Sequence, residues 1–163
     1  MIEMGRPVSF LSLLELHEQL DELFYQHQEA LLKLDVSLAL ERFDVYERRL
    51  REHIRHEEER LLPVYERAGR IEGGAVVFFT GEHKRMLEFL TRIRARVEDL
   101  IAKPANLERE IISLFDQQAM FKQLVEHHDQ RERNILYPTL DKVTDENERR
   151  LLLEWPQAHR GLS

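Results

Sequence analysis

One pattern occurs twice in this chain and constrains its fold more than any other feature. His53 and Glu57 are four residues apart, as are His128 and Glu132, and each histidine precedes a proline by ten residues. Positions i and i+4 of an α-helix lie on one face. Each copy therefore predicts a helix that presents an imidazole beside a carboxylate. Two such faces turned toward each other would form a site of two histidines and two glutamates.

The composition of the chain is typical of one helical domain. Of 163 residues, 42% are hydrophobic and 34% are charged, with few glycines and prolines, which favours helices over sheet or disorder. This length corresponds to about one domain with a buried core. No apolar run approaches the ~20 residues that span a membrane, and the N-terminus lacks the features of a signal peptide. We therefore expect a cytoplasmic protein without a membrane partner.

Charge and cysteine content limit the partners and the ligands. The formal net charge of −7 argues against nucleic acid as a partner, because phosphate binding requires a basic face. The chain has no cysteine, which excludes disulfides and thiolate ligands. A metal would therefore be held by imidazole and carboxylate, a combination that suits iron, manganese or zinc.

Apolar residues at helical spacing predict four long amphipathic helices joined by short connections. Asp35 or Ser37 can cap the second helix, and Pro63 is expected to kink or loosen its last turns. A short helix is expected to end at about Trp155, with a loose tail from Pro156 onward. The four long helices are expected at about 10–34, 37–68, 75–102 and 107–137. The expected division is an N-terminal segment (1–9), the helical domain (10–140), and a short helix with a tail (141–163).

Short connections make sequential helices antiparallel, which predicts an all-α, up-down-up-down four-helix bundle. His17 lies nineteen residues before the centre of the first turn, and His53 lies seventeen residues after it. His83 and His128 lie twenty-two and twenty-three residues from the centre of the third connection. With a rise of about 1.5 Å per residue, these differences amount to a few ångströms. One histidine from each helix is therefore expected in a single layer with the two glutamates.

This layer predicts a metal site rather than an ordinary core. A single histidine on an apolar face is more often a core residue, but two buried carboxylates without a cation cost several kcal/mol. Two divalent ions bridged by the carboxylates would remove that cost. Without metal, Glu57 and Glu132 are expected to take up protons. Asp21, four residues after His17, has two alternative roles. It is either an additional metal ligand or a carboxylate that accepts a hydrogen bond from a ligand. The predicted ligands are His17, His53, Glu57, His83, His128 and Glu132.

The remaining four histidines are expected to lie outside this layer. His27 is about 12 Å along the helix axis from it, and we expect a core or partly buried hydrogen-bonding residue there. His56 lies among charged residues on a face expected to be solvated. His127 competes with its neighbour His128, but His128 has the apolar neighbours and the spacing to the glutamate. His159 is expected in the tail.

The motifs resemble those of the hemerythrin-like (HHE cation-binding) family. The resemblance rests on a histidine in the first helix, Glu82-His83 in the third, and His-x3-Glu in the second and fourth. The last two motifs continue into Leu61-Leu62-Pro63 and Leu136-Tyr137-Pro138. It covers about residues 10–140 and implies a four-helix bundle around a non-haem di-iron centre. The implied bridging ligands are Glu57 and Glu132, and the implied terminal ligands are His17, His53, His83 and His128.

Two differences from the oxygen-carrying hemerythrins limit which members of the family this sequence resembles. Leu87 stands where oxygen-carrying hemerythrins have a second histidine on the third helix, and the fourth helix has His-x3-Glu in place of His-x4-Asp. The six-ligand set is more similar to the di-iron domain of iron–sulfur-cluster repair proteins, whose N-terminal paired-cysteine segment this sequence lacks. The resemblance implies open metal positions suited to O₂, peroxide or NO rather than a plain reversible oxygen carrier.

Three classes of function remain open. The first is a di-iron protein that binds or senses iron, O₂ or NO, without enzymatic turnover. The second is a di-iron enzyme, which is an oxidase, a peroxidase or an NO-reducing or repair protein. The third is a metal-free helical interaction module, which the buried carboxylates disfavour. The Glu-x2-His signature of ferritin-like sites is absent, because the residue three before each of the eight histidines is never glutamate. We expect the first class, with a small diatomic molecule or peroxide as ligand and no assigned protein partner.

Overall fold

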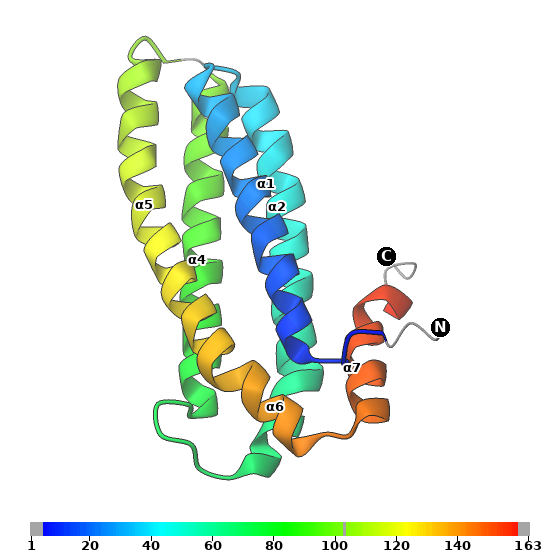
Figure 1. Ribbon diagram of the computed structural model, residues 1–163. Coiled ribbons are helices and arrows are strands. Elements are labelled where there is room, and N and C mark those ends of the chain that lie inside the picture. Colours follow the sequence, from blue (N-terminus) through cyan, green and yellow to red (C-terminus); the bar gives the residue numbers. More distant parts are fainter. Residues whose placement is uncertain (1–4, 103, 160–163) are drawn as a thin grey trace.

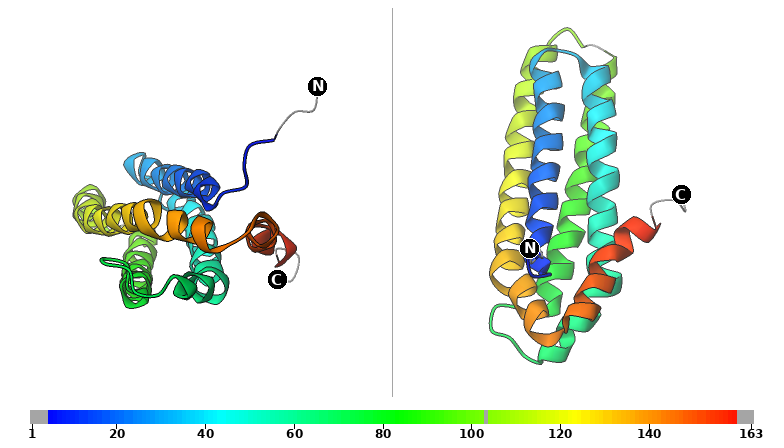
Figure 2. Two further views of the ribbon diagram at one scale, coloured as in Figure 1. Left: turned by 60° about the horizontal axis from the view of Figure 1, so that its bottom comes forward. Right: turned by 45° about the vertical axis from the view of Figure 1, so that its right-hand side comes forward.

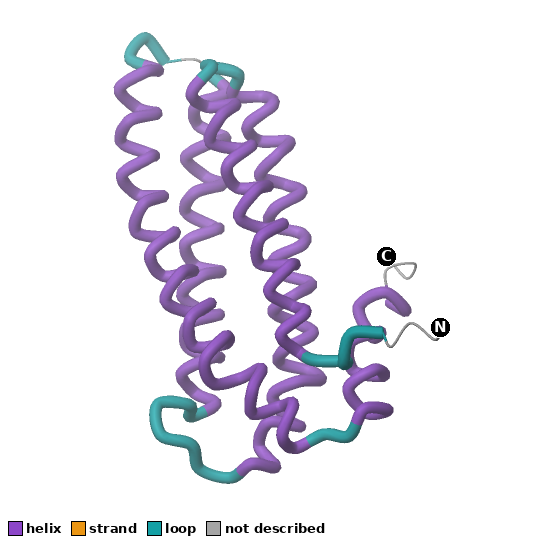
Figure 3. The backbone as a smooth tube through the Cα atoms, in the orientation of Figure 1, coloured by secondary structure: helices purple, strands orange, loops and turns teal. Residues whose placement is uncertain are grey.

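Helices make up all of the regular structure in the computed structural model, which describes residues 5–102 and 104–159; no strand occurs there (Figure 3). The prediction of an all-helical protein is therefore confirmed for these residues. The long helices are α1 Leu14–Leu32, α2 Val36–His56, α4 Val76–Ile101 and α5 Leu107–Arg131. The shorter helical segments are η1 Phe10–Leu13, η2 Glu57–Leu61, α3 Leu62–Tyr65, η3 Glu66–Ala68, η4 Glu132–Leu136, α6 Tyr137–Val143 and α7 Glu146–His159.

The four longest helices lie side by side along most of their length, and each runs opposite to the one before it (Figure 1). Contacts join α1 to α2, α2 to α4, α4 to α5 and α5 to α1, so each helix has two neighbours within the group. A further helix, α7, lies outside this group and packs against α2 (Figure 2). Within the described residues, no helix combines the length and the apolar character that crossing a membrane requires.

The turn between α1 and α2 is short because two capping arrangements share it. The N–H of Asp35 donates to the carbonyl of Ala30 and that of Leu34 to Leu31, the pattern of a Schellman motif. Leu34 closes this motif with a φ of 62°, a left-handed conformation that glycine usually supplies. The Asp35 side chain then caps α2 by accepting from the N–H of Leu38 at 3.1 Å. Asp35 rather than Ser37 is thus the cap, and α1 and α2 are held antiparallel.

Each copy of the repeated pattern ends in a π-helical turn that begins at its glutamate. In η2 and η4 the glutamate carbonyl accepts from the N–H five residues later, that of Leu62 or Tyr137. A proline follows each turn, and proline has no N–H with which to continue the ordinary helical ladder. The loosening expected at Pro63 therefore takes the form of a π turn, which occurs frequently at functional sites.

The apolar core consists of two clusters with polar residues between them. On α2, Leu50 belongs to the larger cluster and Leu61, beyond the helix end, to the smaller one. The same order runs from Leu20 in α1 to Leu13 in η1, and along α4 from Met86 to Phe79. In these three helices the predicted ligands lie between the two clusters, so apolar side chains close the polar layer on both sides.

The C-terminal region differs from its prediction. The α7 helix continues through Pro156 to His159, so the tail expected from Pro156 is wrong for these residues, while residues 160–163 lie outside the described part of the chain. The expectation that His56 faces solvent is also wrong. Its side chain is buried, and Nε2 donates to the carbonyl oxygen of Leu152 in α7 at 2.8 Å. The cause is tertiary packing, because α7 covers this face of α2.

His27 lies in the core and satisfies both ring nitrogens, as the hydrogen-bonding role predicted for it requires. It has no exposed surface, and Nδ1 donates to the carbonyl of Ala39 at 2.7 Å. Nε2 accepts from the Gln118 side chain at 2.8 Å. Both contacts suit a neutral imidazole, and burial lowers the pKa of His27 to about 4. This histidine is therefore neutral in the folded protein at pH 7.

We expect His27 to make folding sensitive to mild acid. Its folded pKa of about 4 lies below its unfolded value of 6.5, so between these values the unfolded chain binds more protons and unfolding becomes easier as the pH falls. From pH 7 to pH 5 the loss should be about 2 kcal/mol for this residue. Chemical denaturation of the wild type and His27→Gln at both pH values measures it. Parallel losses in the two proteins would contradict this assignment.

Candidate metal centre

The structure brings the six predicted residues together in one place. They form two overlapping groups, and in each group the candidate ligand atoms lie within 4.8 Å of one another. All six side chains are buried, with exposed fractions between 0% and 6%. Both glutamates belong to both groups. The groups are His17, His53, Glu57 and Glu132, and Glu57, His83, His128 and Glu132. Buried groups of this composition can hold a metal ion.

Each shared carboxylate turns one oxygen toward each group. Glu57 places Oε1 2.5 Å from Nε2 of His53 and Oε2 3.1 Å from Nε2 of His83. Glu132 places Oε2 3.1 Å from Nε2 of His17, while its Oε1 pairs with Nε2 of His128. Two carboxylates therefore span the space between two pairs of imidazoles. This arrangement is the one that two neighbouring cations bridged by carboxylates require.

The four imidazoles all turn Nε2 toward the interior of the cluster. Nε2 of His17 lies 3.2 Å from that of His53, and Nε2 of His83 lies 3.1 Å from that of His128. Two nitrogens bound to one ion at about 2.1 Å and at right angles would be about 3 Å apart. The observed spacing within each pair therefore fits two ligands of a common ion.

Carboxylates behind the imidazoles fix which nitrogen carries the proton. Nδ1 of His83 lies 2.9 Å from Glu58, and Nδ1 of His128 lies 3.3 Å from Glu82. A carboxylate accepts a hydrogen bond, so these contacts favour the tautomer with the proton on Nδ1. In the neutral imidazoles the two Nε2 atoms then carry lone pairs that face and repel each other. Only a bound cation or an additional proton between them removes this repulsion. The donor set thus fits a metal.

Without metal, the cluster holds its protons on imidazoles rather than on carboxylates. Burial opposes protonation of His53, but Glu57 and Glu132 outweigh it and raise its pKa to about 10. The pKa of His128 is also raised, because Glu132 outweighs burial. Burial alone would raise the pKa of both glutamates, yet the neighbouring histidines hold each below its usual range. The expectation that the two glutamates take up protons is therefore wrong.

Glu82 is a third buried acid, for which the sequence predicted no role of its own. Its side chain is 4% exposed and accepts from Nδ1 of His128 at 3.3 Å and from Nε of Arg131 at 3.0 Å. Burial would raise the pKa of Glu82, but His128 and Arg131 hold it below its ordinary value. Adjacent helical residues do not face each other. Glu82 therefore supports a histidine on α5 instead of its neighbour His83.

Tyr137 belongs to the group that contains His17, although no role was predicted for it. Its hydroxyl donates to Oε2 of Glu132, and its oxygen lies 3.0 Å from Nε2 of His17 and 3.4 Å from Oε1 of Glu57. The π turn brings residue i+5 over Glu132, and the first copy of the pattern has Leu62 at that position. Burial and the two carboxylates raise the pKa of this hydroxyl. The two groups therefore differ in their surroundings.

The remaining candidates lie outside the two groups. Nδ1 of His17 faces Asp129 at 3.5 Å, so Asp129 takes the position behind a ligand that was considered for Asp21. Burial raises the pKa of Asp129 to about 6. His127 is 64% exposed and contacts Arg131, whereas its neighbour His128 is 2% exposed and lies inside the cluster.

Comparisons of the chain with protein-family models, with curated proteins and with solved structures give no match.

Proposed function

We propose that this protein is a non-haem dinuclear metal protein of hemerythrin-like type that binds or senses iron, O₂ or NO. The observation that carries this proposal is the sharing of both buried carboxylates by two groups of ligand atoms. One ion would satisfy one group and leave the other pair of facing imidazoles uncompensated. Two ions satisfy both pairs and both carboxylates.

In this proposal each long helix supplies one terminal ligand. His17 and His53 hold one ion, His83 and His128 hold the other, and the two glutamates bridge them. The ring of α1, α2, α4 and α5 supports the assignment to a hemerythrin-like bundle, because each helix contacts two others and carries one of these histidines. Iron is the metal that the resemblance implies, and manganese and zinc are the alternatives that accept the same nitrogen and oxygen donors.

The residues around the proposed ions determine their surroundings and therefore their chemistry. A bound pair of redox-active ions supplies electrons to a small ligand such as O₂, peroxide or NO. The apolar clusters above and below the layer exclude bulk water, so the electrostatic attraction between ions and carboxylates is strong. Glu58 and Glu82 orient the imidazoles of His83 and His128.

The second candidate is a di-iron enzyme, an oxidase, a peroxidase or an NO-reducing protein. Tyr137 favours this alternative, because its hydroxyl oxygen lies 3.0 Å from Nε2 of His17 and its proton is donated into the cluster, toward Glu132. A positioned proton donor aids the reduction of a bound small molecule. The third candidate, a metal-free interaction module, would have to keep two imidazolium–carboxylate pairs in its core.

The absorption spectrum of protein purified in air separates these three classes. We expect near-ultraviolet and visible bands of a coupled pair of ferric ions, which disappear on anaerobic reduction. Reduced protein, kept in excess reductant and mixed with O₂, peroxide or NO, should then bind about one molecule per site, without continued consumption of that molecule. Continued consumption of one of these molecules would support the enzyme. A colourless, metal-free and fully folded protein would support the interaction module.

A further inference from the structure

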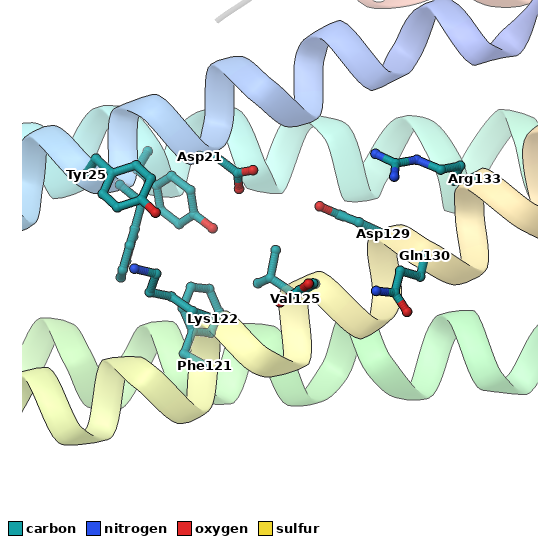
Figure 4. A pocket seen from close by; sticks show the side chains of 11 residues that line it. Asp21, Tyr25, Phe121, Lys122, Val125, Asp129, Gln130 and Arg133 are labelled. Carbon is teal, nitrogen blue, oxygen red and sulfur yellow. The ribbon is translucent and has the colours of Figure 1, made fainter.

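A cavity of about 320 Å³ opens between α1 and α5, beside the ligand layer (Figure 4). Its floor is aromatic, and its walls and rim carry charged side chains. In Figure 4 the carboxylates of Asp21 and Asp129 extend toward each other from the two helices. The lining residues that matter here are Asp21, Tyr46, Lys122, Val125, Glu126 and Asp129.

A much smaller cavity lies next to this one and extends to the cluster of proposed metal ligands. The smaller cavity has a volume of about 10 Å³ and is lined by His17, His53 and His128. It shares Asp21, Tyr46, Val125 and Asp129 with the larger cavity. A space of this volume holds about one water molecule. The two cavities therefore adjoin along these four residues, and together they outline a path from solvent toward three of the proposed ligands.

The charge at the inner end of this path favours cations. Asp21 and Asp129 line both cavities, and among the described residues no lysine or arginine lines the narrow one. The outer cavity adds Glu126 and two cations, Lys122 and Arg133. Nζ of Lys122 lies 4.5 Å from the centre of the Tyr25 ring, which also lines the outer cavity, and donates to Gln28 at 3.3 Å. Carboxylates that line a cleft with low-dielectric walls concentrate cations there.

Tyr46 offers an oxygen at the point where the two cavities meet. Its side chain is only 3% exposed and lines both cavities. Within the described part of the chain, no hydrogen bond is made by its hydroxyl. The hydroxyl oxygen is not among the fully buried atoms that lack a partner, so it lies at the cavity surface, where water or a ligand can contact it. An ion that loses water in the narrow part could take up this oxygen together with those of Asp21 and Asp129.

We infer that this path is the entrance through which divalent cations load the buried centre, with Asp21, Tyr46 and Asp129 forming a transient cation site. The inference rests on the proposed metal centre and adds how that centre is filled. The ligand is a divalent cation such as Fe²⁺, because the polar side chains that line the narrow part outside the histidines are the oxygen donors Asp21, Tyr46 and Asp129, with the thioether of Met86 beside them. The ion would exchange waters for these oxygens before it reaches His17 and His53.

The test is the rate at which metal-free protein takes up Fe²⁺ under anaerobic conditions, with Co²⁺ as a spectroscopic probe. Asp21→Asn should slow uptake about tenfold at low salt. Release to a chelator should slow by the same factor, so the equilibrium dissociation constant should stay within about twofold of the wild type, because an entrance changes a barrier and not the final site. The matched control is Glu22→Gln, which removes the same charge from the next residue of α1, outside this cavity.

Three results would overturn the inference. Equal uptake rates for Asp21→Asn and the wild type would exclude this entrance. Equal slowing of uptake in Glu22→Gln would show that the slower uptake reflects the change in net charge alone. A weaker equilibrium affinity with unchanged uptake would make Asp21 a ligand. Failure of the wild type to bind metal would contradict the proposed function itself. The three results above can be obtained only with a wild type that binds metal, so the two kinds of failure are distinguishable. Circular dichroism of each variant controls for folding.

Discussion

Removal of bound metal by a chelator is expected to lower the melting temperature of this protein by roughly 10 °C. A ligand that binds only the folded state at a thousandfold excess over its dissociation constant contributes about 4 kcal/mol. For a chain of this length, each 1 kcal/mol shifts the melting temperature by about 2–4 °C. The metal would join all four long helices through the six proposed ligands. Its loss should therefore affect the whole fold and not one end of it.

The difference between the two forms should be larger at pH 8 than at pH 6. In the metal-free protein the pKa of His53 is about 10, above its unfolded value of 6.5. The stability that its proton supplies is complete below about pH 6.5 and is lost as the pH rises toward 10. The metal-bound form does not need that proton. Thermal unfolding of both forms at both pH values, followed by circular dichroism, measures the difference. Equal melting temperatures at pH 8 would mean that this core does not need an ion.

His128→Ala should remove at least one of the two proposed ions, whereas His127→Ala should leave the metal content unchanged. The two residues are adjacent, but His128 is 2% exposed with Nε2 3.1 Å from that of His83, and His127 is 64% exposed. Loss of a buried ligand removes a metal bond and leaves Oε1 of Glu132 without its imidazole partner. Loss of the exposed histidine removes one contact with Arg131.

Metal analysis of both purified variants, with the wild type alongside, measures this difference. His127→Ala is the matched control, since it makes the same side-chain change on the same helix. Similar metal loss in both variants would show that the ligand face of α5 is displaced by one residue. Glu132 would then have to be reassigned together with His128.

The repeated His-x3-Glu pattern made the six residues predictable because helical geometry is local. A spacing of four residues fixes a common face, and short connections fix the relative heights of antiparallel helices. The layer of His17, His53, His83 and His128 follows from these two rules. Neither rule requires knowledge of the contacts between residues far apart in the sequence. Agreement is accordingly best for the long helices and for the residues on their inner faces.

The contacts that the sequence did not predict depend on which helix lies opposite. Glu82 supports His128 on another helix, and Asp129 rather than Asp21 lies behind His17. Burial of His56 requires α7, whose packing against α2 has no signal in the sequence of α2. Such pairings arise from tertiary packing between segments far apart in the sequence.

Tyr137 was missed for a different, local reason. Helical periodicity of 3.6 residues places position i+5 off the face of residue i, so Tyr137 was not expected beside Glu132. The π turn in η4 changes that periodicity. The signal was Pro138, which follows Tyr137. A disturbance was predicted only for its counterpart Pro63, as a kink or loosening and not as a change of turn. The protonation of the cluster was also missed, because it depends on distances between imidazoles and carboxylates that a spacing pattern does not supply.

The ratio of metal to protein tests the dinuclear centre most directly. Elemental analysis of protein purified from iron-supplemented cells should find about two iron ions per chain, bound by nitrogen and oxygen ligands alone. Replacement of Glu57 by alanine, which removes a carboxylate common to both groups, should reduce the content of both ions. One tightly bound zinc per chain in a tetrahedral site, or a folded wild type that contains no metal after such growth, would contradict it.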